Sequence, residues 1–286
     1  MTDINERELE RLDLTSAFGY LYITMTRYSQ LENKHIHFIG VAGTGMIGLV
    51  QFIIDIPSLT ISGSDLNYSP AIETLEQQGL IFSQSHEQKL VIQADFVVVS
   101  TAISKDNPEL CEAHKHNKKI LHRSEFLRDL MLPFDQRIGV AGTHGKTTSS
   151  GFLASILNES PSSPSYVIGG QQLKTKKNAQ RGDGGAFIAE ADESDGTFLE
   201  YDFNTAIVTN VEQDHMNFFK TPEKLFFLFE TFLQKIISKQ GLLVLNVDDP
   251  WLSKKAKEFN KHQVYTISIF KEATCTATNI KYHENS

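Results

Sequence analysis

The stretch "GVAGTHGKTT", residues 139–148, follows an apolar strand pattern and opens a helix pattern. Glycines at this junction allow a tight turn whose backbone amides can surround an anion. Lys146 can reach the β- and γ-phosphates of a nucleoside triphosphate, and the Thr147 hydroxyl can ligate Mg²⁺. Val140 stands where the strict P-loop pattern has a glycine, so the prediction rests on the remaining GTxGKTT. The expected triphosphate site consists of Gly142, Thr143, His144, Gly145, Lys146, Thr147 and Thr148.

Nearly the same letters occur earlier, as "GVAGTGMIG" at residues 40–48. Here a GxGxxG lies between a strand pattern and a helix pattern, and Asp65 follows about 20 residues later, where a ribose-binding carboxylate belongs. The alternative is a glycine turn that only packs the helix against the strand. Because this copy lacks the lysine, we expect it to hold a diphosphate that does not react. The residues assigned to this site are Gly43, Thr44, Gly45, Gly48 and Asp65.

Around the two turns, short apolar strands alternate with helices of about ten residues, a pattern typical of βαβ units in a parallel sheet. The series begins at residue 35 and restarts after "LPFDQ" at 132–136, which we interpret as a linker. The sequence therefore predicts an N-terminal extension at 1–34 and two α/β domains. A Rossmann-like domain is expected at 35–134, and a P-loop-type domain at 135–286.

The composition excludes several classes of protein. The net charge is −8 and no basic stripe is present, which argues against nucleic acid as a partner. The two cysteines, Cys111 and Cys275, lack a metal-type spacing and are expected to be reduced thiols. No apolar run reaches the ~20 residues that span a bilayer, and the first residues lack a signal-type apolar core. We expect a cytoplasmic protein with no membrane contact.

Acidic and polar side chains follow three later strands of the second domain. Glu190 comes directly after "FIA", so it can reach a Mg²⁺ ion held beside Lys146. Glu193 and Asp195 are either further ligands or part of a solvated loop. His215 stands in "EQDHMN" beside another acidic cluster, and Asn246 ends a strand where it could touch a nucleotide sugar or base, or belong to a plain turn.

The segment "KTKKNAQRG", residues 174–182, concentrates positive charge between two strands. A charge run of this kind is by default a solvated surface loop. The functional alternative is a clamp on an anionic substrate at the junction of the two domains. The sequence leaves both interpretations open.

Seven motifs in order resemble the Mur ligase family. They are "HIHFIGVAGTGMIG", "SGSD", "VVVSTAISKDNPE", "RSEFL", "GVAGTHGKTT", "EADESDGTF" and "NVEQDHMNFF". The resemblance implies an ATP-dependent amide-bond ligase of peptidoglycan precursor synthesis, with UDP-N-acetylmuramate and L-alanine as substrates. It implies that the turn at 43–48 and Asp65 contact the UDP-sugar, and that the turn at 142–148 and Asn246 hold ATP. Lys146, Glu190 and His215 become the catalytic residues, and Thr147, Glu190 and His215 the ligands of Mg²⁺.

The same resemblance implies a third, C-terminal domain, which residues 1–286 do not contain. We therefore expect a fragment, one piece of a split enzyme completed by a separate C-terminal domain, or a degenerate paralogue that only binds nucleotides. A related ligase that recycles murein tripeptide is a further alternative. A dehydrogenase that uses the first turn for NAD would leave GTHGKTT unexplained.

Overall fold

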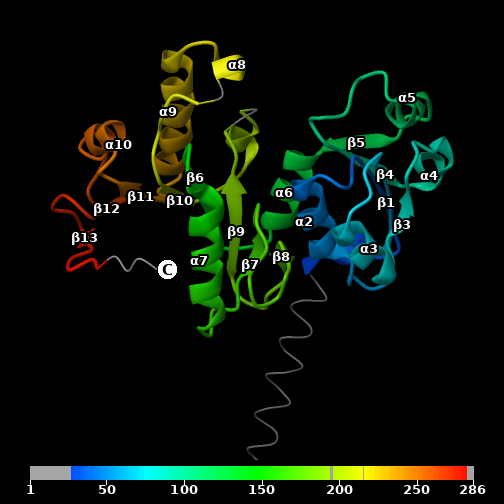
Figure 1. Ribbon diagram of the computed structural model, residues 1–286, viewed down its shortest axis with the longest axis horizontal. Helices are drawn as coiled ribbons and strands as arrows, with labels where there is room; N and C mark the ends of the chain where they lie inside the picture. Colours follow the sequence, from blue (N-terminus) through cyan, green and yellow to red (C-terminus); the bar gives the residue numbers. More distant parts are fainter. Residues whose placement is uncertain (1–26, 194–195, 215, 282–286) are drawn as a thin grey trace, which may run out of the picture.

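A computed structural model describes residues 27–193, 196–214 and 216–281. It contains two β-sheets, one for each glycine turn (Figure 1). Most of the expected extension at 1–34, together with Asp195 and His215, lies outside the described residues. No helix in the described part of the chain has the length and apolar character to cross a membrane.

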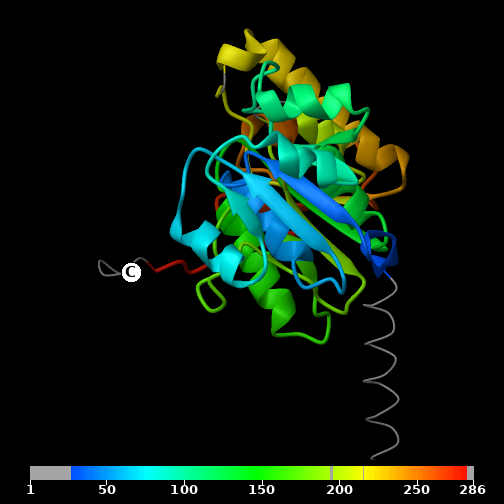
Figure 2. The ribbon, with the colours of Figure 1, turned by 90° about the vertical axis from the view of Figure 1, so that its right-hand side faces the viewer.

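The first sheet is parallel throughout, with strand order β3-β2-β1-β4-β5. Its strands are β1 (His35–Ile39), β2 (Thr60–Ser64), β3 (Ile81–Ser83), β4 (Phe96–Val99) and β5 (Lys119–His122). Its helices are α2 (Thr44–Ile53), α3 (Pro70–Gln77), α4 (Gln88–Gln93), α5 (Pro108–Lys115) and α6 (Arg123–Met131). Figure 2 looks onto this part of the molecule. The expected Rossmann-like alternation is confirmed, while the short β3 and α4 were not predicted.

Several helix starts are fixed by local side chains. Ser69 and Asn107 accept hydrogen bonds from the first-turn amides of α3 and α5, and each helix has proline at its first position. At α6 the His122 side chain and Glu125 form a capping box, so the helix begins at Arg123. These caps explain why the three helices begin at these residues.

The second sheet has the order β13-β12-β11-β10-β6-β9-β7-β8 and is parallel except for the β7–β8 pair. Its strands are β6 (Gln136–Ala141), β7 (Ser165–Val167), β8 (Ala179–Gln180), β9 (Ala186–Ala191), β10 (Thr205–Val208), β11 (Leu242–Asn246), β12 (Val264–Ser268) and β13 (Cys275–Thr276). Its helices are α7 (Lys146–Asn158), α8 (Met216–Phe219), α9 (Pro222–Ser238) and α10 (Pro250–Lys255), with the 3-10 turn η2 (Thr197–Glu200). The 3-10 turn η1 (Ser29–Leu31) precedes β1 of the first sheet. β8 lies inside the segment expected to be a loop.

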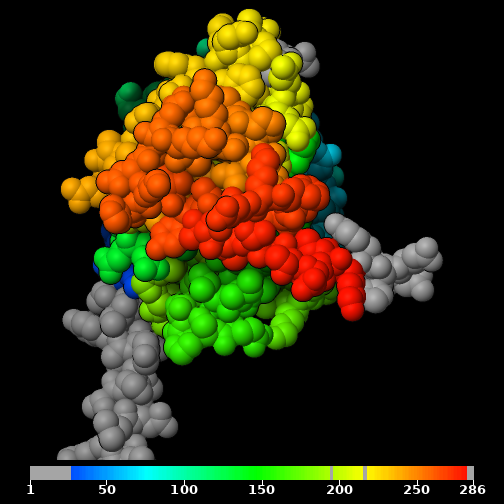
Figure 3. Space-filling view, turned by 90° about the vertical axis from the view of Figure 1, so that its left-hand side faces the viewer, coloured from blue at the N-terminus to red at the C-terminus, as the bar shows by residue number. Residues whose placement is uncertain are grey.

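Helices cover both faces of this second sheet. Ile188 of β9 packs with Ala154 of α7 on one face, whereas its neighbour Phe187 points into the main core on the other face. Phe229 of α9 belongs to that main core. Figure 3 shows the end of the molecule where α10 (orange) lies above the red segment with β13, and α7 (green) lies below. Buried faces on both sides are typical of parallel sheets.

One apolar core joins the two sheets. Phe52 of α2 lies with its ring centroid 5.3 Å from that of Phe187, and Phe134 lies 5.2 Å from the same ring. Tyr28 packs edge-on against Phe52 and donates a hydrogen bond to the Leu130 carbonyl at 2.8 Å. The expected linker at 132–136 is therefore anchored by a buried phenylalanine, and α2 packs directly on the second domain (Figure 1).

Candidate functional site

The second glycine turn is an open loop between β6 and α7. Gly142 has φ +132° and Gly145 has φ +83°, backbone conformations that residues with a side chain rarely adopt. A Cβ at Gly142 would lie 2.1 Å from the Thr209 hydroxyl, so the segment after β10 closes against the turn. Asn210 fixes that contact, because its backbone carbonyl and side-chain oxygen accept the amides of Thr143 and His144 at 3.1 and 2.9 Å.

Lys146, the first residue of α7, folds back over this turn. Its ammonium group donates to the Gly142 carbonyl at 2.8 Å and to both carboxylate oxygens of Glu193 at 2.8 and 3.0 Å. Glu193 is only 1% exposed, and burial raises the pKa of its carboxyl, while the hydrogen bond and charge of Lys146 oppose that shift. Glu193, which the sequence left undecided, is therefore the partner of the lysine.

The two expected metal ligands that the structure describes lie together. The Thr147 hydroxyl donates to Glu190 Oε2 at 3.1 Å. Glu190 Oε1 accepts bonds from the Ser150 hydroxyl at 2.9 Å and the Gly169 amide at 2.6 Å. Sequence reasoning missed Ser150, although it lies three residues after Thr147, a spacing that brings side chains together on one helix face.

Asn246 lines an open hollow of about 570 Å³ next to the second turn. Its side-chain amide donates to the Thr209 carbonyl at 2.9 Å, which ties β11 to the segment that closes the turn. The rings of Phe226 and Trp251 stack at a centroid distance of 5.6 Å on another wall. A flat apolar wall beside polar groups suits a nucleotide base. The hollow therefore fits the role expected of Asn246. The sequence did not point to the Phe226–Trp251 pair.

The first turn has a different construction. Gly43 has φ −64° and caps α2, which begins at Thr44. Asp65 accepts the amide of Ala42 at 3.0 Å and that of Asn67 at 2.9 Å, so its carboxylate fixes the turn. Whether it also touches a sugar remains a prediction.

Two glycines of this first turn have close neighbours. Gly48 is buried in α2, where a Cβ would lie 3.1 Å from Val167 of the second domain. This favours the packing alternative at that position over substrate contact. A Cβ at Gly45 would lie 3.3 Å from the guanidinium of Arg123. Arg123 was missed because it is close to the turn only in space.

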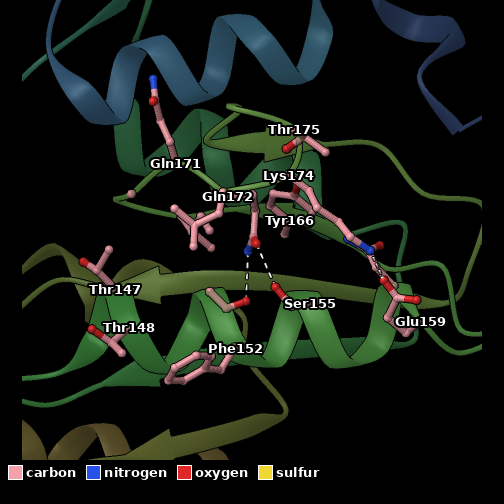
Figure 4. A pocket seen from close by; sticks show the side chains of 15 residues that line it. Thr147, Thr148, Phe152, Ser155, Glu159, Tyr166, Gln171, Gln172, Lys174 and Thr175 are labelled. Carbon is pink, nitrogen blue, oxygen red and sulfur yellow. Dashed lines mark hydrogen bonds and ion pairs between the residues drawn. The ribbon is translucent and has the colours of Figure 1, made fainter. Parts of the chain in front are cut away.

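A further hollow, of about 500 Å³, lies between α7 and the segment 170–175 (Figure 4). Thr147 and Thr148 line one end, and Lys174 pairs with Glu159 at 2.5 Å near the other. The basic segment 174–182 has an exposed part and a part that joins the two domains, and its interpretation as a clamp on substrate stays a prediction. Residues 174–177 are exposed, whereas Arg181 binds Asp55 of the first domain at 2.5 Å.

The described residues contain no group of three or more histidine, cysteine, aspartate or glutamate side chains arranged to hold a metal. Magnesium still fits the pair of Thr147 and Glu190, because Mg²⁺ usually takes only one or two carboxylates and completes its shell with phosphate oxygens and water. His215 lies outside the described residues, and its expected role stays a prediction.

Two family models cover most of the chain. The model for the Mur ligase family, catalytic domain, matches residues 35–135, and the Mur ligase middle domain matches residues 140–286. The chain belongs to the Mur ligase family, which confirms the resemblance seen in the motifs.

Two similar curated relatives carry the same name. The chain is 40% identical over 224 residues to the UDP-N-acetylmuramate--L-alanine ligase of Desulforamulus reducens, covering 78% of this chain and 48% of the relative. It is 41% identical over 223 residues to the enzyme of that name from Renibacterium salmoninarum, covering 78% and 47%. The chain spans about half the length of the curated relatives it matches.

Solved structures confirm the fold class. The UDP-N-acetylmuramate-alanine ligase of Thermotoga maritima matches with a TM-score of 0.73 at 25% identity, covering 85% of this chain and 54% of that one. The UDP-N-acetylmuramate:L-alanyl-gamma-D-glutamyl-meso-diaminopimelate ligase of Neisseria meningitides matches with a TM-score of 0.72 at 26% identity, covering 82% and 78%.

Proposed function

We propose that this chain provides the sugar-nucleotide and ATP sites of a ligase that joins L-alanine to the lactyl carboxylate of UDP-N-acetylmuramate. The observation that carries the proposal is the pairing of two unlike anion turns. One turn has Lys146 at its mouth and Thr147 against Glu190 at 3.1 Å. The other begins α2 without a lysine, which suits a diphosphate that is held and not transferred.

The chemistry requires activation of a poor acyl donor. A carboxylate oxygen of the sugar attacks the γ-phosphorus of ATP, the bond to the β-phosphate oxygen breaks, and ADP leaves. The amine of L-alanine then attacks the acyl phosphate, loses a proton and expels inorganic phosphate. In such transfers the protein contributes mainly positioning and charge stabilisation.

This chain has residues for both tasks. Lys146 supplies a positive charge at the mouth of the second turn, and the amides that begin α7 after Gly145 would face a bound phosphate. Thr147 and Glu190 would hold Mg²⁺, which neutralises charge on the phosphates when bound. Asn210 keeps the turn in shape through the amide of His144. Asn246 and the Phe226–Trp251 wall would accept the base.

The ligase that acts on a murein peptide is the second candidate. The structural match to the Neisseria ligase covers 78% of that solved chain, against 54% for the Thermotoga ligase. The curated relatives at 40% identity instead carry the alanine ligase name. The two candidates differ in the amine acceptor, so the choice between L-alanine and a tripeptide separates them.

The test measures binding first and turnover second. Calorimetry with the purified chain should detect the binding of ATP and of UDP-N-acetylmuramate. Phosphate release from ATP should then depend on L-alanine when the C-terminal half of the Desulforamulus relative is added. Binding without release in any combination would support a non-catalytic module, and binding of neither nucleotide would overturn the proposal.

Lys146→Met provides the first specific prediction. Because the variant loses the cation nearest the transferred phosphate, phosphate release should fall at least ~100-fold. Binding of UDP-N-acetylmuramate should stay within twofold of the unaltered chain, which serves as the control. An equal loss of affinity for both nucleotides would mean that the two turns do not divide their roles as proposed.

A further inference from the structure

Each glycine turn has a cation beside it, but the two cations come from different parts of the chain. Lys146 belongs to the second turn itself, at the first position of α7. The first turn has Arg123, whose guanidinium nitrogen lies 3.3 Å from the Cβ position at Gly45. The capping box of His122 and Glu125 places Arg123 at the start of α6, facing that turn.

Two adjacent carboxylates after β9 bind these two cations. Glu193 holds the Lys146 ammonium through both oxygens, at 2.8 and 3.0 Å. Asp192 has its Oδ2 atom 3.9 Å from a guanidinium nitrogen of Arg123. One short segment of the second domain therefore reaches the cation of each turn.

We propose that Asp192 and Glu193 stand in for phosphate, each holding the cation of one glycine turn until the phosphates of an incoming nucleotide displace it. The assignment makes Arg123 the positive group that binds a diphosphate at the first turn. It rests on the proposed function for the identity of the nucleotides, and extends it to the contacts that the two cations make before a nucleotide binds.

Geometry favours displacement over a permanent ion pair. Lys146 points back to the Gly142 carbonyl and Glu193, whereas a phosphate in the turn would lie against the amides that begin α7. A single ammonium has three donors, all of which have acceptors here: the Gly142 and Thr143 carbonyls and Glu193. Binding a triphosphate therefore requires that at least one of these contacts be given up.

The free-energy cost of displacing the carboxylate should differ between the two turns. The Glu193–Lys146 pair is buried, with side chains 1% and 15% exposed, and its contacts are short. The Asp192–Arg123 pair is longer, and its side chains are 41% and 22% exposed, so solvent screens it. Glu193 should therefore weaken nucleotide binding more strongly than Asp192 does.

A crossed binding experiment tests this inference. Calorimetry with Mg²⁺-free ATP and with UDP is applied to Glu193→Gln and Asp192→Asn. Glu193→Gln should raise the affinity for ATP about tenfold, which corresponds to about 1.4 kcal/mol, and leave the affinity for UDP unchanged. Asp192→Asn should tighten UDP about twofold and leave ATP unchanged. Each variant removes one negative charge from neighbouring positions, so each controls for the other.

Additional variants keep the test decisive. Arg123→Gln should weaken UDP about tenfold, whereas Arg128→Gln, on the same helix but paired with Asp129, should not. In a Lys146→Met background, Glu193→Gln should no longer tighten ATP, because the carboxylate acts through that lysine. If Glu193→Gln fails to fold, Glu193→Asp keeps the charge but loosens the pair, and should tighten ATP less.

The outcomes separate this inference from the proposed function. Unaltered binding of ATP by Glu193→Gln, or tightening of both ligands by either variant, would overturn the displacement model while the proposed function stands. If the unaltered chain binds neither ATP nor UDP, both are wrong.

Discussion

The two copies of GVAGT are identical in letters and different in conformation. In the first copy the strand ends at Ile39, Gly40 turns with φ +83°, and α2 begins at Thr44. In the second copy the same letters continue β6 to Ala141, and the turn comes at Gly142 and Gly145. The same three letters, Gly-Val-Ala, thus form a turn in one domain and the end of a strand in the other.

Neighbouring strands explain this difference. Ala141 pairs with Ala191 of β9 and Val208 of β10, so β6 is held on both sides up to its last residue. Gly139 has Phe203 above it, with the Cβ position only 2.6 Å from that ring, so its glycine serves packing. Gly40 serves a positive φ instead. Identical residues can therefore meet different physical requirements.

The largest expected effect comes from replacing the corresponding glycine of each turn by alanine. Gly142→Ala places a Cβ against Thr209 at a φ of +132°, and should lower the free energy of unfolding by about 2 to 4 kcal/mol. Gly43→Ala meets only ordinary contact at 3.5 Å, and should cost less than about 1 kcal/mol. Chemical denaturation measures both. Equal losses would mean that the turns share one conformation after all.

A second test compares the buried glutamates of the two domains. Burial alone would raise the pKa of Glu109, but hydrogen bonds from His37 and Ser64 outweigh it, so the pKa lies below its usual value. Its stabilisation is therefore present at neutral pH and lost as pH falls below about 4.5, the ordinary glutamate value. Glu109→Gln should lower the free energy of unfolding at pH 7 by about 2 kcal/mol and flatten its acid dependence.

Glu193 should behave in the opposite way. Burial raises its pKa, so its ionised form costs stability above the ordinary glutamate pKa, and that cost disappears as pH falls. Glu193→Gln should therefore lower the free energy of unfolding at pH 7 by less than Glu109→Gln does. Denaturation curves at pH 7 and pH 4 for both variants give the comparison. A large loss for Glu193→Gln would show that the pair is structural.

The smallest effect is expected in the basic segment 174–182. Lys174 is 85% exposed and pairs with Glu159 across the hollow on α7. Lys174→Gln should leave the affinity for UDP unchanged in calorimetry, because the first turn has Arg123 as its cation. A clear weakening would support the interpretation of this segment as a clamp on substrate.

Local signals in the sequence determined the two α/β series, the strand-turn-helix position of each glycine turn, and the pairing of Thr147 with Glu190. These features depend on apolar periodicity, glycine spacing and the rule that parallel strands point their carboxyl ends the same way. The family follows from the same ordered motifs.

Only the tertiary structure decided which residues far apart in the sequence meet. Arg123 reaches Gly45, Glu193 reaches Lys146, and Gly48 packs on Val167, although each pair is separated by at least 47 positions. Such contacts depend on how α2, α6 and β9 pack around one shared core, and no local pattern encodes that packing. The two turns therefore differ because their surroundings differ, even where their letters agree.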